Sequence, residues 1–268
     1  KYQSGIFSRD LGIDKTLYSL DASLVTLIID MFPWAKFRAT KGAVKMHTLF
    51  NVTQMIPTMM NITTGKIHDL EGMPHLNKET FSDSIVTFDK GYWRASWMNR
   101  LNKDGIFFVT RIKHNVNYKV TGQHEIKLGS GVLRDEEIRL TSVQLSEEYP
   151  EKLRLVTYHD QEHDRTYKFI TNIDYMKAST IAQIYKYRWQ IEIFFKWIKQ
   201  NLKIKTFFGT SRNAVFSQIW IALIYFLLIS YIHTQAKYPY TKLELTRVID
   251  EILFERISIL NLLSANFK

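Results

Sequence analysis

The 268-residue sequence contains no cysteine. This absence excludes disulfide-stapled scaffolds, thiolate metal sites and cysteine nucleophiles, and it fits a cytosolic protein. The chain opens with no signal peptide, and it holds no internal repeat or low-complexity tract. The most apolar run, Ile219–Ile232, has about fourteen residues, fewer than the roughly twenty needed to span a bilayer. We therefore expect a buried core helix there and no membrane partner.

Acidic residues are scarce where basic residues gather. The chain has 36 Lys and Arg against 26 Asp and Glu, and the net charge of +10 favours an anionic partner such as nucleic acid. Residues 186–212 hold seven basic side chains and one acid, Glu192, and residues 36–45 hold four basic side chains and no acid. A hydrophobic fraction of 46% indicates a globular protein with a sizeable core.

Alternating apolar and β-branched residues predict five strands in the first part of the chain. They are Thr16–Ile29, Val44–Val52, Met55–Thr63, Ile85–Phe88 and Gly105–Ile112. His68–Thr80 is expected to be partly helical and Trp93–Leu101 to be a helix. Three strands followed by alternating helices and strands indicate a layered α/β sheet that is at least partly parallel.

The segment 115–172 differs in character, because its apolar residues fall in short runs separated by hairpin turns such as Leu128–Gly131. Its predicted strands are Tyr118–Thr121, Glu125–Leu128, Gly131–Arg139, Lys152–Tyr158 and Tyr167–Asn172. This pattern predicts an all-β insertion of about 60 residues.

The insertion is followed by a segment without Gly or Pro, Ile184–Lys203, which is predicted to be one helix. At about 100° per residue, four polar side chains fall within roughly 60° of one another, beside an apolar stripe. These side chains are Tyr185, Arg188, Glu192 and Lys199. A basic turn (Lys203–Arg212), an apolar helix (Ala214–Lys237) and an amphipathic stretch (Lys242–Ser264) are expected to follow.

Three carboxylates are candidates for a metal site. Asp21 lies within the first strand, Asp89 follows the strand Ile85–Phe88, and Glu192 lies on a helix that can cross the sheet. Gly91 is expected to supply the sharp exit from the strand that ends at Asp89. Hard oxygen ligands suit Mg²⁺ or Mn²⁺, and two such ions would relieve the repulsion among three carboxylates and support phosphodiester cleavage.

Cationic side chains beside Glu192 suit a phosphate backbone. Arg188 can bind a phosphate through two N–H groups, Lys199 offers a point charge two turns further on, and Tyr185 offers a hydroxyl donor.

The spacing Tyr185-x2-Arg188-x3-Glu192-x6-Lys199 resembles the signature of the bacterial insertion-sequence-four type of DDE transposase. Further similar segments are LDAS around Asp21, VKMH at Val44–His47, ITTGKIHD at Ile62–Asp69 and FDKGY at Phe88–Tyr92. The resemblance covers the chain from about Ser19 to at least Phe208.

This resemblance implies an α/β fold in which an RNase H-like mixed sheet is flanked by helices, with the all-β insertion before the catalytic Glu helix. The implied divisions are 1–114 and 176–212 for the core, 115–175 for the insertion and 213–268 for a C-terminal helical region.

The resemblance also implies a function: metal-dependent cleavage and transfer of DNA strands by a cut-and-paste route through a hairpin. Asp21, Asp89 and Glu192 would hold two divalent ions, Mg²⁺ or Mn²⁺. Tyr185, Arg188 and Lys199 would bind DNA phosphates, and Tyr167 would stack on a flipped base, although a core tyrosine is an equal alternative. The expected partners are double-stranded DNA, as transposon ends and target, and a second copy of the chain, in the bacterial cytoplasm at the nucleoid.

Two other interpretations stay open. Relatives carry an additional N-terminal region that binds the element ends, whereas this chain begins twenty residues before Asp21. It is therefore expected to be a catalytic fragment or a truncated product, and a silent DNA-binding remnant or inhibitor of transposition is the alternative function. His159-x-x-Glu162-His163 matches a zinc protease pattern, but it lies between two predicted strands and is expected to be a polar hairpin loop. The role of His68 is left open.

Overall fold

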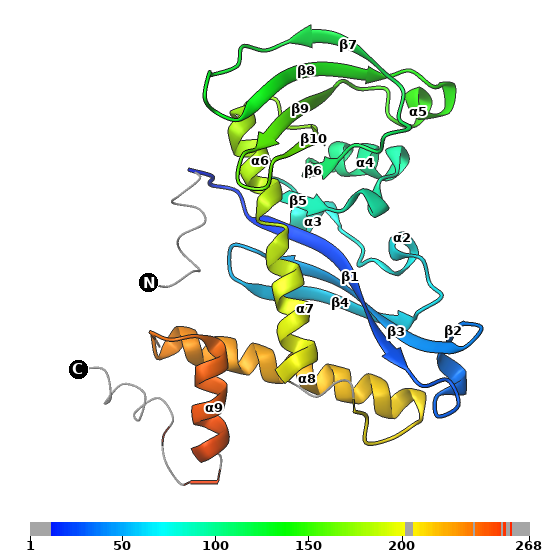
Figure 1. Cartoon of the computed structure of the whole chain (residues 1–268), viewed down its shortest axis with the longest axis vertical. Helices are drawn as coiled ribbons and strands as arrows, with labels where there is room; N and C mark the ends of the chain where they lie inside the picture. The colour runs from blue at the N-terminus through cyan, green and yellow to red at the C-terminus, as the bar shows by residue number, and fades with distance from the viewer. Residues whose placement is uncertain (1–11, 202–205, 238, 253, 256–257, 259–268) are drawn as a thin grey trace.

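A computed structural model of the chain describes residues 12–201, 206–237, 239–252, 254–255 and 258 (Figure 1). Ten described strands form one mixed sheet in the order β2-β3-β1-β5-β6-β10-β9-β8-β7, with β4 paired to β3. The strands are β1 (Leu17–Leu27), β2 (Lys36–Arg38), β3 (Lys41–Asn51), β4 (Ile56–Thr64), β5 (Ile85–Phe88), β6 (Phe107–Arg111), β7 (Tyr118–Gln123), β8 (Val132–Leu140), β9 (Leu153–Asp160) and β10 (Arg165–Thr171). The α-helices are α2 (Asp69–Gly72), α3 (Lys78–Phe81), α4 (Ala95–Lys103), α5 (Val143–Glu148), α6 (Ala178–Lys186), α7 (Trp189–Asn201), α8 (Arg212–Gln235) and α9 (Lys242–Ile252), and the 3-10 turns are η2 (Pro33–Ala35) and η3 (Lys90–Tyr92).

The centre of the sheet changes from antiparallel to parallel pairing at β1. Strand β1 pairs antiparallel with β3, which pairs antiparallel with β4, and on its other side β1 pairs parallel with β5, which pairs parallel with β6. The helices α3 and α4 supply the crossovers that parallel strands require. This arrangement confirms the predicted α/β class with a mixed sheet flanked by helices.

Two hydrophobic clusters lie on the two faces of the sheet, because successive side chains of a strand point to opposite faces. On one face α6, α7 and α8 pack against the sheet, with the ring centroids of Phe50 and Phe194 5.2 Å apart. On the other face α3, α4 and α5 pack against it, with Phe88 and Trp97 4.7 Å apart. Figure 1 shows α7 crossing the sheet at β1, so residues of α7 lie over the ends of the parallel strands.

The insertion continues the same sheet, because β10 pairs antiparallel with β6 and is followed outward by β9, β8 and β7. Two sequence expectations for it are wrong. The predicted strand Glu125–Leu128 is absent, and the side chains of these residues are exposed, so no buried face holds them in a ladder. The segment 143–148 is the short helix α5 within an insertion expected to be all β, and it covers the face that carries α4. The division of the chain into domains stays a prediction.

The helix expected over Ile184–Lys203 is broken. The helix α6 ends at Lys186 and α7 starts at Trp189, and Arg188 lies between them. The backbone N–H groups of Arg188 and Gln190 donate to carbonyls three residues back, at 3.0 Å each, so the turn tightens here. Tyr185 and Arg188 therefore belong to the end of one helix and to the junction, while Glu192 and Lys199 lie on α7.

The apolar helix α8 begins and ends two residues earlier than the predicted Ala214–Lys237, and it is less buried than expected. It has 24 residues and is long and apolar enough to cross a membrane by length and composition alone, with 39% of its most apolar window buried in the protein. One face, which includes Ile219 and Phe226, packs in the core, while Ile221 and Leu228 are more than half exposed. The expectation of a buried core helix therefore holds for the inner face and is wrong for the outer face. Most of the stretch after Ile252 lies outside the described residues.

Candidate active site

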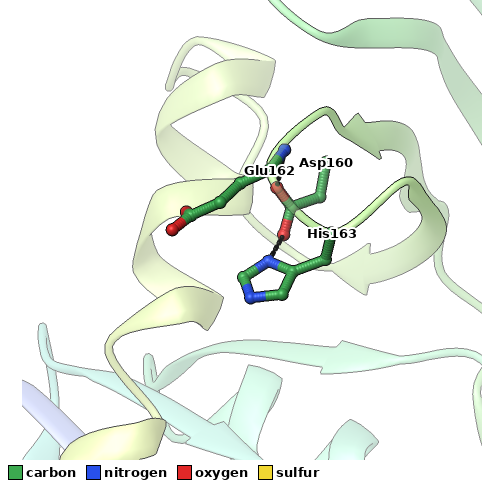
Figure 2. Close-up of side chains that lie close together, drawn as sticks. All are labelled: Asp160, Glu162 and His163. Atoms are coloured by element: carbon green, nitrogen blue, oxygen red, sulfur yellow. Dashed lines mark hydrogen bonds and ion pairs between the residues drawn. The ribbon is translucent and has the colours of Figure 1, made fainter.

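One exposed cluster has potential metal ligands near one another. Within the described parts of the chain, the donor atoms of Asp160, Glu162 and His163 lie within 4.8 Å (Figure 2). Figure 2 shows the His163 ring on the Asp160 carboxylate, with Nδ1 2.9 Å from Oδ2, and Glu162 accepts a hydrogen bond from Lys186. The cluster is the turn between β9 and β10, as the sequence predicted, so no helix places His159 and His163 on one face as a zinc protease requires.

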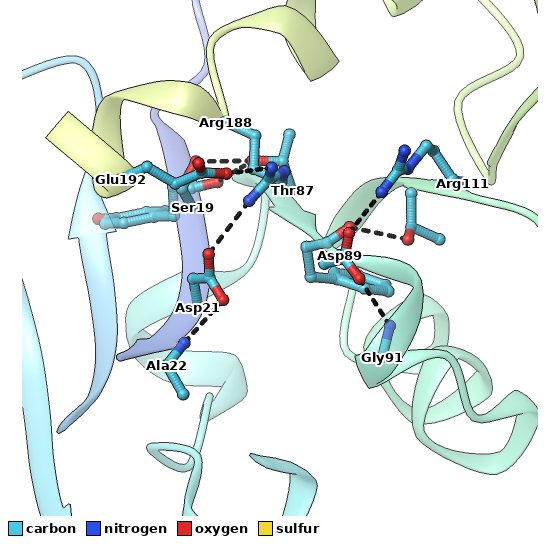
Figure 3. A network of polar contacts seen from close by, with 12 residues as sticks. Ser19, Asp21, Ala22, Thr87, Asp89, Gly91, Arg111, Arg188 and Glu192 are labelled. Atoms are coloured by element: carbon cyan, nitrogen blue, oxygen red, sulfur yellow. Dashed lines mark hydrogen bonds and ion pairs between the residues drawn. The ribbon is translucent and has the colours of Figure 1, made fainter. Parts of the chain in front are cut away.

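A second polar group lies where the parallel pairing of β1, β5 and β6 ends (Figure 3). Strand alternation places Ser19 and Asp21 of β1 on the face covered by α7, and it places Thr87 and Asp89 there from β5. The Ser19 and Thr87 hydroxyls are 2.8 Å apart and buried, which holds β1 and β5 together just before the two carboxylates. Arg111 at the end of β6 lies on the same face, two residues beyond buried Val109.

Asp21 and Glu192 share one guanidinium. Arg188 donates from Nη1 to Asp21 Oδ2 at 3.1 Å and from Nη2 to Glu192 Oε1, and Figure 3 shows it between the two carboxylates. Burial raises the pKa of Asp21 to about 6, although the Ala22 N–H and Arg188 act in the opposite direction. Asp21 is thus a partly desolvated carboxylate that a cation must neutralise at neutral pH.

Asp89 is held by two donors from its surroundings. Its Oδ1 accepts the Gly91 N–H at 3.0 Å and its Oδ2 accepts Arg111 Nη2 at 2.7 Å. Burial alone would raise the pKa of Asp89, but these hydrogen bonds and the nearby arginines hold it below its ordinary value. Gly91 lies in the 3-10 turn η3 without a left-handed φ, and a Cβ there would meet only Asp89 Oδ1, at 3.7 Å. The expectation that glycine freedom makes this turn is therefore wrong.

Tyr185 lies between the two arginines. Its ring centroid is 5.6 Å from the guanidinium carbon of Arg188 and 5.8 Å from that of Arg111, and its other neighbour is the Phe169 ring at 4.8 Å. The side chain is 9% exposed, and burial raises the pKa of its hydroxyl. Within the described residues, two buried donors here have no hydrogen-bond partner, Arg111 Nε and Arg188 Nε, while the Tyr185 hydroxyl lies near both guanidiniums. Buried donors without a partner are costly, so this point favours an acceptor-rich ligand such as phosphate.

The remaining predicted side chains lie further from the carboxylates. Lys199 is half-buried on α7, two turns beyond Glu192. Tyr167 is half-buried on β10, and its ring stacks on Phe169 with centroids 5.9 Å apart. Of the basic turn Lys203–Arg212, residues 203–205 lie outside the described part of the chain.

Sequence reasoning missed Arg111. A signal existed, because Arg111 ends the apolar strand predicted next after the strand of Asp89, and neighbouring parallel strands bring their carboxyl ends to one edge of the sheet. Arg111 has no place in the four-residue spacing around Glu192, so the motif alone could not reveal it.

Residues 21–228 match the model of the family described as the transposase DDE domain. The chain belongs to this family. It is 34% identical over 227 residues to a protein of Sinorhizobium fredii named as transposase y4zB, an alignment that covers 83% of this chain and 63% of that protein. It is 29% identical over 231 residues to a protein of Geobacillus stearothermophilus named as the transposase for insertion sequence element IS5377, with 85% of this chain and 60% of that protein covered.

The DDE transposase chain thus spans about three fifths of the length of these relatives. Among solved structures it is similar to a piggyBac transposase in a synaptic complex with hairpin DNA, with a TM-score of 0.49, 11% identity, and 93% of this chain and 57% of that chain covered. Family membership confirms the predicted transposase class. The predicted use of divalent metal ions is consistent with this family.

Proposed function

We propose that this DDE transposase domain cleaves DNA strands and joins the resulting 3′ ends to new DNA in a reaction that requires divalent metal ions. The observation that supports this most directly is the placement of Asp21 and Asp89 on adjacent parallel strands, with Glu192 on the helix that covers the same face. Three carboxylates on one face of the sheet supply the hard oxygen donors that suit metal-dependent attack on a phosphodiester.

Asp21, Asp89 and Glu192 fit divalent metal ions by their chemistry. All three are carboxylates, all are partly accessible with side-chain exposures of 21%, 32% and 34%, and no thiolate competes because the chain lacks cysteine. They would hold two Mg²⁺ or Mn²⁺ ions, which activate a water or 3′-hydroxyl and stabilise the leaving oxygen.

In the proposed reaction, Arg188 and Arg111 pair with carboxylates first and with a DNA phosphate once metal ions are bound. In this structure each neutralises a carboxylate, Arg188 on Asp21 and Glu192 and Arg111 on Asp89. When the carboxylates bind metal ions, both guanidiniums become available to the phosphate next to the cleaved bond. Their unpartnered Nε–H groups and the Tyr185 hydroxyl supply further donors, and Lys199 supplies charge along α7.

The expected partners follow from family and charge. The net charge of +10 suits double-stranded DNA as transposon end and as target, and homologous proteins named as transposases support this assignment. We propose further that the chain works as a homodimer on DNA in the bacterial cytoplasm at the nucleoid, that the route passes through a DNA hairpin, and that Tyr167 contacts a displaced base.

A nicking assay tests the proposal. Wild-type chain and the Glu192→Gln variant are incubated with supercoiled plasmid and with duplex DNA, in Mg²⁺, Mn²⁺ or EDTA. Glu162→Gln is the matched control, because it neutralises an exposed carboxylate in the β9–β10 turn. We expect metal-dependent nicking by wild type and control, and a loss of at least about a hundredfold in Glu192→Gln.

A different result would favour the second function. If neither wild type nor Glu192→Gln nicks DNA while both bind it with the same dependence on salt, the enzyme proposal fails for this chain. The DNA-binding remnant would then be the better account.

A further inference from the structure

A basic cavity adjoins the carboxylates on the side away from α7. It has a volume of about 700 Å³ and lies among α2, η3, the start of α4 and α5, at the same edge of the sheet where β5 and β6 end. Its wall includes His68, Gly91, Arg94, Lys113 and Glu148. Gly91 donates its N–H to Asp89 at 3.0 Å, so one residue both contacts the catalytic carboxylate and lines the cavity.

The charges on this wall are available to an anion. Arg94 and Lys113 form no ion pair with any described residue, and among the described residues the Lys113 ammonium donates only to the Trp93 carbonyl, at 3.3 Å. The one acid on the wall is Glu148, and both its oxygens are engaged: Oε2 accepts the Ser96 N–H at 3.1 Å and Oε1 accepts the Gln144 side chain at 2.9 Å. Because these donors are neutral, Glu148 keeps its charge, and the two cations against this one carboxylate leave the wall with a net charge of about +1.

A buried donor on the wall also lacks a partner. Trp93 lines the cavity and is 6% exposed, and its indole N–H has no hydrogen bond within the described structure. An unsatisfied buried N–H costs about 1–3 kcal/mol. The Trp93 nitrogen is itself shielded from solvent, so the groups on the wall that a ligand can reach are the Arg94 and Lys113 cations, whose chemistry suits phosphate oxygens.

We propose that this cavity binds the phosphodiester backbone of the DNA that continues past the cleavage position, on the side opposite to the phosphates held along α7. The inference rests on the proposed function and deepens it, because it gives the strand a path on both sides of the three carboxylates. Arg188 and Lys199 lie on the α7 side, whereas Lys113 follows Arg111 by two residues.

The first test is the salt dependence of binding. The Arg94→Ala/Lys113→Ala variant is compared with wild type by fluorescence anisotropy on a duplex of about 40 bp, across a KCl series. Lys119→Ala/Lys127→Ala is the matched control, because it removes the same charge from exposed positions of the insertion. We expect the slope of log affinity against log salt to fall by about 2 in the cavity variant, at about 0.9 for each phosphate that the variant no longer neutralises, and to fall by less in the control.

The second test locates the contact. On a duplex that wild type nicks, the nick is mapped and the DNA is then shortened on one side or the other. The cavity variant should nick the full duplex more slowly than wild type, and the defect should disappear when the DNA is trimmed on one side of the nick only. Circular dichroism and thermal melting establish that the variant is folded.

Either of two results would overturn the proposal: an unchanged salt slope in the folded cavity variant, or an equal decrease of the slope in the control. If no protein nicks DNA, the proposed function fails, while the salt slopes still decide whether the cavity binds phosphates.

Discussion

Arg188 binds Asp21 across 167 positions of sequence, with Nη1 3.1 Å from Oδ2, and the same guanidinium binds Glu192 four residues further along the chain. A guanidinium keeps its charge at any physiological pH, so this pairing reduces the repulsion between two carboxylates and offsets one of their two negative charges. The candidate active-site face is therefore organised around cations before any metal ion binds. The stability and the activity of the protein should both depend on whether these carboxylates are paired with arginines or with metal ions.

Replacing Asp21 with Asn should stabilise the metal-free protein at neutral pH. Burial raises the pKa of Asp21 to about 6, so the folded state favours the protonated form. The stability that this preference contributes is complete below about pH 4 and is lost as the pH rises through about 6, at about 1.4 kcal/mol per pKa unit. We expect Asp21→Asn to gain about 1–3 kcal/mol over wild type at neutral pH in EDTA, measured by urea denaturation, with a smaller gain at about pH 4.5.

The control for this prediction is Asp30→Asn, an exposed carboxylate at the end of the loop after β1. Its stability should follow that of wild type at both pH values. Mg²⁺ should stabilise wild type and leave Asp21→Asn unchanged. A variant that is less stable than wild type at neutral pH would show that the Arg188 pair outweighs the desolvation of Asp21.

Replacing Arg111 with Gln should separate its effect on the pKa of Asp89 from its proposed contact with a DNA phosphate. Loss of the 2.7 Å hydrogen bond should raise the pKa of Asp89 toward its ordinary value, which NMR titration of the carboxyl carbon measures. Nicking should fall at least about tenfold, because a charge-assisted contact to phosphate is worth about 1.5–3 kcal/mol. Arg139→Gln, in the insertion, should nick as wild type does. If Arg111→Gln moves the pKa of Asp89 and leaves nicking intact, Arg111 only positions Asp89.

Replacement by alanine should destabilise the protein at Gly72 and leave its stability nearly unchanged at Gly91. A Cβ at Gly72 would lie 2.1 Å from His47 Nε2, and His47 is fully buried on β3 beneath α2. Gly72→Ala should therefore cost more than about 2 kcal/mol, because a packed ring must move. Gly91→Ala, with its nearest atom at 3.7 Å, should stay within about 0.5 kcal/mol of wild type. Denaturant midpoints of both variants check this, and equal costs would contradict this difference in packing.

Lys242 should make stability rise at alkaline pH. Burial lowers its pKa to about 8, and its ammonium lies 3.1 Å from the Met55 carbonyl and 4.6 Å from the Phe226 ring centroid. Between about pH 8 and 10 the unfolded chain keeps this proton and the folded chain loses it, so stability increases with pH in that window. Lys242→Met should remove this increase and should be more stable than wild type at neutral pH by about 1–3 kcal/mol. Lys119→Met, an exposed control, should keep the wild-type profile, and a wild-type curve that falls across this pH window relative to Lys242→Met would contradict the prediction.

The sequence by itself determined the order and type of most elements. Strands such as β1, β3 and β5 were predictable because alternation of apolar residues is a local property of the chain. The same local pattern identified Asp21 and Asp89 at strand positions and Glu192 on a helix, and their spacing carried the resemblance to DDE transposases that the family match then confirmed.

Only the tertiary structure decided which cation lies on which carboxylate, where the helix breaks and which face of α8 is covered. Arg188 tightens the chain between α6 and α7 while it reaches Asp21, and Arg111 reaches Asp89 from a neighbouring strand. These relationships join residues far apart in the chain, so no periodicity along the sequence encodes them. The outer face of α8 is as apolar as its buried face, and apolar composition cannot tell which of the two another element will cover.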